Sequence, residues 1–305
     1  MSLRRRRDKV SNVLSDDRIR RTDEAYSRQM RYQVPVIALH CSGAGASQWY
    51  SLAEALGDDY DLLAPEHYGS ASNGAWTGEH AFTLADDAAR AIALIDASQS
   101  KVHLVGHSYG GGVALHVALA RPSQIASLVL YEPSAFHLLR QLGEPGAEAF
   151  SEIAGVAQQV ADGVLTGDYR RALAGFVNYW SGIGTWERMR PAAQRALICW
   201  APKGPLDFHA LIEDPTPASA YRTLKCPALI MRGEHALKPS RIIAERLAEL
   251  LPDSRLLVID GAGHMGPFTH ASEVAALIVR HIAAIDAQSW KAKSRVAAAP
   301  MEAVL

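Results

Sequence analysis

A serine lies at the point where a short apolar run gives way to a helical pattern. Ser108 is the centre of G-H-S-Y-G, which follows apolar residues 102–105 and precedes helical spacing that starts at Val113. Glycines two positions to either side of a serine allow a turn so tight that its hydroxyl stands clear of a sheet. The pattern predicts Ser108 as the nucleophile of an acyl transfer. The alternative is a Gly-rich turn that carries an idle serine.

A nucleophilic serine needs a base, and His264 fits this role best. It lies in G-A-G-H-M-G-P, directly after the apolar run 255–259. In a parallel sheet this loop opens at the same edge as the turn of Ser108. We expect the adjacent His107 to point away from the serine. The other histidines fall in predicted strands, helices or loops where packing or substrate contact is the expected role.

Two backbone N–H groups are candidates for stabilising an oxyanion. One belongs to Tyr109, the residue after the serine and the first of the predicted helix. The other belongs to Ser42, in the small-residue loop 40–45 (H-C-S-G-A-G) that follows the first apolar run. N–H groups in these two places point toward the edge where a serine nucleophile stands. The alternative for the second is an ordinary Gly-rich turn.

Alternating strands and helices would position these residues. Apolar runs typical of buried strands alternate with helical spacing up to residue 133, and the rhythm returns at 227. This order predicts an α/β fold, with a mostly parallel, doubly wound sheet and helices on both faces. The strand patterns lie at 34–40, 60–64, 102–105, 125–131, 227–231 and 255–259.

The alternation is interrupted at 134–220, which holds helical patterns but no convincing strand. We expect this segment to be a helical insertion over the carboxyl ends of the strands, and therefore a cap or lid; a helical domain packed elsewhere is the alternative. The core is then expected at 34–133 and 221–288, and a C-terminal tail at 289–305.

Residues 1–33 differ from the rest, since they carry ten Lys/Arg against five Asp/Glu. No apolar segment follows the basic one, so a signal peptide is not expected. The composition predicts a flexible tail. A basic arm for an acidic partner, or a natural start at Met30, are alternatives.

Bulk composition narrows the class of protein. The 305 residues carry a net charge of −1, which indicates neither a nucleic-acid nor an anionic-membrane partner, and no apolar run approaches the ~20 residues of a membrane span. An odd number of widely spaced cysteines indicates a reducing, cytoplasmic location. The cysteines are Cys41, Cys199 and Cys226.

Several of these motifs, in this order, resemble the α/β-hydrolase superfamily, in its serine esterase and lipase-like branch. The resemblance covers 34–133 and 221–288, and rests on V-I-A-L-H with the following loop and Trp49, L-L-A-P-E-H-Y-G-S, V-H-L-V-G-H-S-Y-G-G and L-L-V-I-D-G-A-G-H-M. It implies the cap and a mechanism without metal or cofactor. Two features depart from the superfamily pattern. The strands that usually precede V-I-A-L-H are not recognisable here, which suggests a shortened sheet. Cys41 replaces a glycine in the oxyanion loop.

A third departure concerns the acid that orients the base. Most members of the superfamily keep an aspartate after the next-to-last strand, where this chain reads R-G-E-H-A-L-K-P with Ala236 at the expected position. Some members, including a branch of the haloalkane dehalogenases, place the acid one strand earlier. Glu132, in L-V-L-Y-E-P, is therefore our predicted acid. Glu234 is the alternative, and a third possibility is that neither serves.

The sequence thus predicts a serine hydrolase that cleaves an ester or similar acyl bond of a small, fairly apolar substrate. A lactonase, amidase or carbon–carbon bond hydrolase would use the same residues. A hypothesis from another class of protein is a non-catalytic small-molecule binder or receptor on the same fold. It is motivated by Ala236, which stands where an acid is expected. The motifs do not specify the substrate, and the oligomeric state is not predicted.

Overall fold

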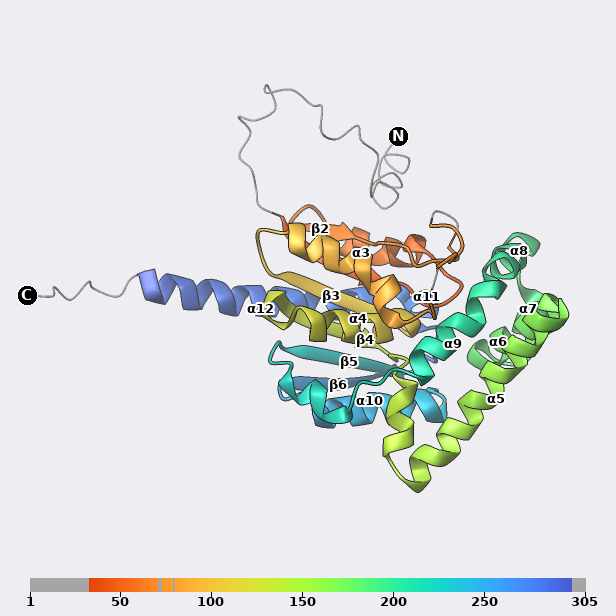
Figure 1. Cartoon of the computed structure of the whole chain (residues 1–305). Coiled ribbons are helices and arrows are strands. Elements are labelled where there is room, and N and C mark those ends of the chain that lie inside the picture. Colours follow the sequence, from red (N-terminus) through yellow and green to blue (C-terminus); the bar gives the residue numbers. More distant parts are fainter. Residues whose placement is uncertain (1–32, 71–72, 79, 298–305) are drawn as a thin grey trace, which may run out of the picture.

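The computed structural model describes residues 33–70, 73–78 and 80–297. The basic tail expected at 1–33 falls outside these residues apart from its last position. Six strands form one sheet in which all neighbouring strands are parallel (Figure 1). Its order is β2 (Tyr60–Leu63), β1 (Val34–Leu39), β3 (Val102–His107), β4 (Ile125–Tyr131), β5 (Ala228–Gly233) and β6 (Ser254–Ile259). The predicted parallel α/β sheet is confirmed, and β1 is the first strand of the described part of the chain.

Helices cover both faces of the sheet because its inner strands are apolar on both sides. Alternate residues of β1 separate into two cores: Ile37 and Leu39 face one, Val36 and Ala38 the other. The first core is shared with α3 (Leu84–Ala97), α4 (Tyr109–Ala120) and α10 (Lys238–Leu250). The second is shared with α2 (Tyr50–Leu56) and α12 (Ala271–Ala297).

The helical insertion lies beside the carboxyl ends of the strands (Figure 1). The predicted helical character of this segment is present in the structure, whereas α7 and α9 were not predicted. Gly204 and Pro205 open α9, where a loop is the ordinary expectation, but both residues are acceptable in a first helical turn. The insertion contains α5 (Glu144–Thr166), α6 (Tyr169–Ser181), α7 (Thr185–Arg188), α8 (Pro191–Trp200) and α9 (Gly204–Ile212).

Short helical turns complete the described chain. They are η3 (Ala46–Trp49), η4 (Pro122–Gln124), η5 (Phe136–Gln141), η6 (Ala201–Lys203), η7 (Ala218–Thr223) and α11 (Gly266–Thr269). The backbone of α12 continues to Ala297, into the segment 289–305 that was expected to be a tail. Residues 286–297 contain neither glycine nor proline, so nothing in them ends a helix. None of the described helices is both long and apolar enough to cross a membrane.

Candidate active site

Ser108 stands between β3 and α4 in a strained conformation. Its φ is +53°, and Glu132 (φ +38°) is the other non-glycine residue of the described chain with a positive φ. Such strain persists only where the surroundings enforce it, and it concentrates at functional sites. The two glycines of G-H-S-Y-G permit the turn. A Cβ on Gly106 would lie 2.5 Å from the Gly110 oxygen, and one on Gly110 would lie 2.3 Å from the Leu39 oxygen.

Three polar side chains from three strand ends form one hydrogen-bonded chain. The Ser108 hydroxyl lies 2.9 Å from His264 Nε2, and His264 Nδ1 lies 2.8 Å from Glu132 Oε2. All three residues are buried, with exposed fractions of 7%, 4% and 0%. With the Nδ1–H donating to the carboxylate, Nε2 is left as the acceptor for the serine proton. This arrangement can activate a hydroxyl for attack on an acyl carbon.

Of the two candidate acids, Glu132 is the one whose carboxylate lies against His264. Its other oxygen, Oε1, accepts the N–H of Gly233 at 2.9 Å, and its own N–H donates to Met231. The end of β5 therefore holds Glu132 in its left-handed conformation. The Glu234 carboxylate instead accepts the N–H of Gly261 at 2.8 Å, which fastens the loop leading to His264.

Buried groups beneath the loop hold the backbone of His264. The Nε2–H of His107 donates to the carbonyl of His264 at 2.9 Å. Burial and the neighbouring His264 keep the pKa of His107 well below its ordinary value, so His107 is neutral. The Tyr131 hydroxyl donates to the Gly263 carbonyl at 2.7 Å. The sequence did not indicate either bond.

The loop after β1 is a tight turn fixed at both ends. The Ala44 N–H donates to the Cys41 carbonyl, and the Cys41 N–H donates to Gln48 at 3.0 Å. The N–H of Ser42, inside the turn, takes no part in closing it. The Tyr109 N–H, at the first position of α4, has no acceptor within its helix. The structure thus places the two N–H groups proposed from the sequence in a closed turn after β1 and at the start of α4.

His40 braces this loop as a neutral ring. Its Nδ1–H donates to the Cys41 carbonyl at 2.8 Å, and its Nε2 accepts the N–H of His67 at 3.2 Å. Only the neutral imidazole offers one donor and one acceptor. Burial lowers the pKa of His40, which agrees with this pattern.

Comparison with known proteins assigns the fold to a family. The model of the α/β hydrolase fold matches residues 34–271. The chain belongs to the α/β-hydrolase family. It is 29% identical over 259 residues to the lipase LipV of Mycobacterium tuberculosis, a match that covers 80% of this chain and 91% of that protein. It is 26% identical to the pimeloyl-(acyl-carrier protein) methyl ester esterase of Aeromonas hydrophila, over 80% and 93% of the two chains.

A solved structure agrees with this family. The enol-lactonase from Burkholderia xenovorans superposes with a TM-score of 0.64 at 18% identity, covering 84% of this chain and 94% of that one. At this identity the likeness speaks for the fold. The family match and the esterase and lipase relatives identify the protein as an α/β-hydrolase enzyme.

In this α/β hydrolase, two residues beside the serine and the base were not singled out from the sequence. The indole of Trp180, on α6, stacks on His264 with ring centroids 4.0 Å apart. The Ser134 hydroxyl lies 3.3 Å from the Ser108 hydroxyl. Trp180 belongs to the helical insertion, so no local pattern connects it with His264. Ser134 follows Glu132 and Pro133. Its position just after a predicted strand was the one feature of the sequence that could have indicated a place beside Ser108.

Proposed function

We propose that this protein is a serine hydrolase, which cleaves an ester or similar acyl bond of a small, fairly apolar substrate through an acyl-enzyme on Ser108. The observation that carries the proposal is the continuous chain of hydrogen bonds from the strained serine through His264 to Glu132. An idle serine on a Gly-rich turn would need neither a base within 2.9 Å nor a carboxylate behind that base.

In the first half-reaction the Ser108 oxygen attacks the acyl carbon while its proton passes to His264 Nε2. Glu132 holds the ring through the Nδ1–H and stabilises the imidazolium that forms. The imidazolium then gives its proton to the leaving alcohol. In the second half-reaction His264 takes a proton from water, and the resulting hydroxide equivalent attacks the acyl carbon. The imidazolium then returns the proton to the Ser108 oxygen as the carboxylic acid product leaves.

Each tetrahedral intermediate carries a negative oxygen, for which the N–H groups of Ser42 and Tyr109 are the proposed donors. Both stand on rigid backbone, in a turn closed by hydrogen bonds and at the first position of α4. Fixed donors in a water-poor site stabilise developing charge without having to reorient, and loss of one donor typically costs about 10²–10³-fold in kcat.

The helical insertion is the proposed cap over this site. Trp180 covers the base, and Ser108 and His264 are almost fully buried, so a substrate enters when the cap moves. Aromatic side chains of the cap gather around Trp180, which favours a fairly apolar acyl group or alcohol. The contacts among them include Phe176 with Trp180, Trp200 and Phe208.

The alternative of a non-catalytic binder rested on Ala236, where an acid was expected. The position of Glu132 against His264 supports catalysis instead, because a carboxylate from the residue after β4 lies behind the proposed base. The names of the relatives, a lipase, a methyl ester esterase and an enol-lactonase, also favour acyl-bond hydrolysis.

A fluorophosphonate probe tests the proposal directly. We expect covalent labelling of the wild-type chain at Ser108, hydrolysis of p-nitrophenyl esters, and loss of both in Ser108→Ala. A panel of esters and lactones with graded acyl lengths then separates esterase from lactonase activity. Wild-type protein that neither reacts with the probe nor hydrolyses any ester would contradict the proposal and favour the binder.

A further inference from the structure

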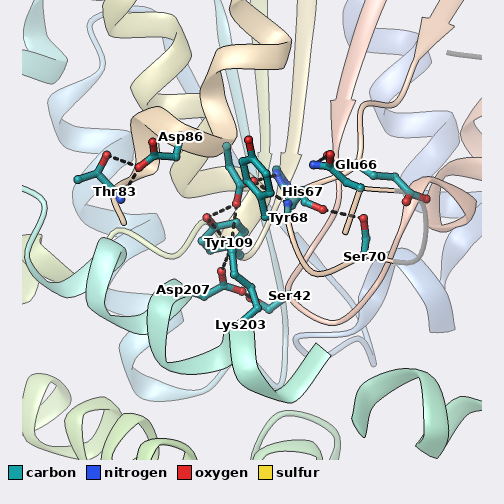
Figure 2. A network of polar contacts seen from close by, with 12 residues as sticks. Ser42, Glu66, His67, Tyr68, Ser70, Thr83, Asp86, Tyr109, Lys203 and Asp207 are labelled. Carbon is teal, nitrogen blue, oxygen red and sulfur yellow. Dashed lines mark hydrogen bonds and ion pairs between the residues drawn. The ribbon is translucent and has the colours of Figure 1, made fainter. Parts of the chain in front are cut away.

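Three charged side chains lie buried where the helical insertion meets the core, and Figure 2 shows two of them, Lys203 and Asp207. Lys203 on η6 and Asp207 on α9 come from the insertion, and Asp87 comes from α3. Their exposed fractions are 3%, 2% and 5%. The Lys203 ammonium donates to both carboxylates, and its distance to Asp87 Oδ2 is 2.9 Å. We call these three residues the charged cluster.

The charged cluster holds the side chains of both proposed oxyanion residues. The Ser42 hydroxyl donates to Asp207 Oδ2 at 2.6 Å, and the Tyr109 hydroxyl donates to Asp87 Oδ2 at 2.6 Å. Lys203 Nζ lies 3.4 Å from the same tyrosine oxygen. The charged cluster therefore connects Ser42 and Tyr109, which follow different strands and whose backbone N–H groups are the proposed oxyanion donors (Figure 2).

The excess of carboxylates in the cluster argues against a role as a receptor for an acidic substrate. Burial alone would lower the pKa of Lys203, but the two aspartates outweigh it and raise the pKa. Burial raises the pKa of Asp207 to about 6, against the opposing effect of Lys203. At neutral pH the cluster thus holds two carboxylates against one ammonium, and this excess of negative charge repels an anionic group.

Stability alone is also a weak reason for the cluster. Removing three charges from water costs several kcal/mol per ion, and apolar side chains of similar volume often serve as well or better. What a charged contact adds is a defined geometry. Close packing also joins the insertion to the oxyanion loop, because a Cβ added to Gly43 would lie only 2.5 Å from the Leu197 side chain.

We propose that Lys203, Asp207 and Asp87 are positioning residues, through which the docked cap sets the two oxyanion donors relative to Ser108. The inference rests on the proposed function, since it assigns a purpose to the donors named there. Asp207 holds the Ser42 turn, Asp87 holds the first turn of α4 through Tyr109, and Lys203 ties the two carboxylates together. The oxyanion site is then complete only when the cap is docked on the core.

The test deletes one link while leaving both backbone donors in place. In the full-length protein, Ser42→Ala removes the hydroxyl but keeps the N–H, and Asp207→Asn removes the charge that receives it. With p-nitrophenyl butyrate we expect kcat to fall about tenfold in each variant and KM to change less than about threefold, because a misplaced oxyanion donor weakens transition-state binding most. The double variant should lose little more than the poorer single variant, because both changes act on the same hydrogen bond, which Ser42→Ala removes and Asp207→Asn weakens.

A matched control breaks a different contact between the cap and the core. Glu148 on α5 pairs with Lys238 at the start of α10; the glutamate is exposed and the lysine is partly exposed. Glu148→Gln should leave kcat and KM within about twofold of wild type. Thermal unfolding of all variants verifies that each is folded.

Three results would overturn the inference. The first is wild-type kcat in Ser42→Ala and Asp207→Asn, the second is losses that multiply in the double variant, and the third is an equal loss in Glu148→Gln. Any of these results, with the wild type still labelled at Ser108, refutes the positioning role alone. Wild-type protein inert to both the fluorophosphonate and the ester refutes the proposed function together with it.

Discussion

The indole of Trp180 lies on the imidazole of His264, with ring centroids 4.0 Å apart and planes inclined by 29°. The tryptophan comes from α6 of the helical insertion and the histidine from the loop after β6, so one contact joins the proposed cap to the proposed base. The ring excludes water from one face of the imidazole. It also presents a π surface to the imidazolium that would form during the reaction, an arrangement that stabilises a cation.

Trp180→Ala should therefore impair the chemical step. We expect kcat for p-nitrophenyl butyrate to fall about tenfold, because the imidazolium loses a stabilising ring and the base gains rotational freedom. Trp180→Phe keeps an aromatic surface and should retain most of the activity. Steady-state kinetics of the two variants make the comparison, and equal kcat in wild type and Trp180→Ala would show that the stacking has no role in turnover.

The two candidate acids make opposite predictions. Glu132→Gln should lower kcat by about 10²–10⁴-fold, because an amide cannot stabilise the imidazolium and can impose the wrong tautomer. Glu234→Gln keeps an acceptor for the Gly261 N–H and should stay within about threefold of wild type. Parallel kcat measurements decide between them. A large loss of kcat in Glu234→Gln alone would instead identify Glu234, which directly follows β5, as the acid.

A pair of glycine substitutions tests the close approach of α4 to β1. A Cβ on Gly110 would lie 2.3 Å from the Leu39 oxygen, whereas one on Gly155, within α5, meets nothing within 4 Å. Gly110→Ala should destabilise the protein by about 1–3 kcal/mol and reduce activity by displacing Tyr109. Gly155→Ala should stabilise it by about 0.5–1 kcal/mol. Urea unfolding measures both, and a neutral Gly110→Ala would contradict the packing described.

Stability should fall on acidification below about pH 6.5. Burial lowers the pKa of His67 to about 3, and the other shifted histidines change in the same direction. Between the folded and the unfolded pKa the unfolded chain binds more protons, so the free energy of unfolding falls as pH falls. Asp207, with its pKa raised to about 6, acts in the opposite direction. The histidines concerned are His40, His67, His107, His116, His137 and His281.

Urea midpoints at pH 7.0, 5.5 and 4.5 measure this dependence. His67→Gln removes one of the groups that must stay neutral, so its midpoint should change less with pH than that of wild type. A midpoint that rises on acidification would show that the carboxyl of Asp207 dominates the histidines.

The parts of the fold that could be predicted are those with strong local patterns in the sequence. Apolar runs and helical spacing indicated the six strands in order, because strands buried on both faces need continuous apolar sequence. The turn around Ser108 was recognisable because it requires a glycine two positions before the serine and another two positions after it. The end of α12 was misjudged, since polar residues without glycine or proline permit a helix as readily as a tail.

Tertiary structure alone decided which distant groups meet. Glu132 and Glu234 both follow strand ends at one edge of the sheet, and only the register of β4 beside β5 places the first against His264 and directs the second to Gly261. Lys203 and Asp207, four residues apart in a segment with no recognisable motif, acquire their partners only when the insertion folds onto α3 and the oxyanion loop. Local sequence determines the backbone of the nucleophile turn, whereas contacts between remote segments depend on how the cap docks.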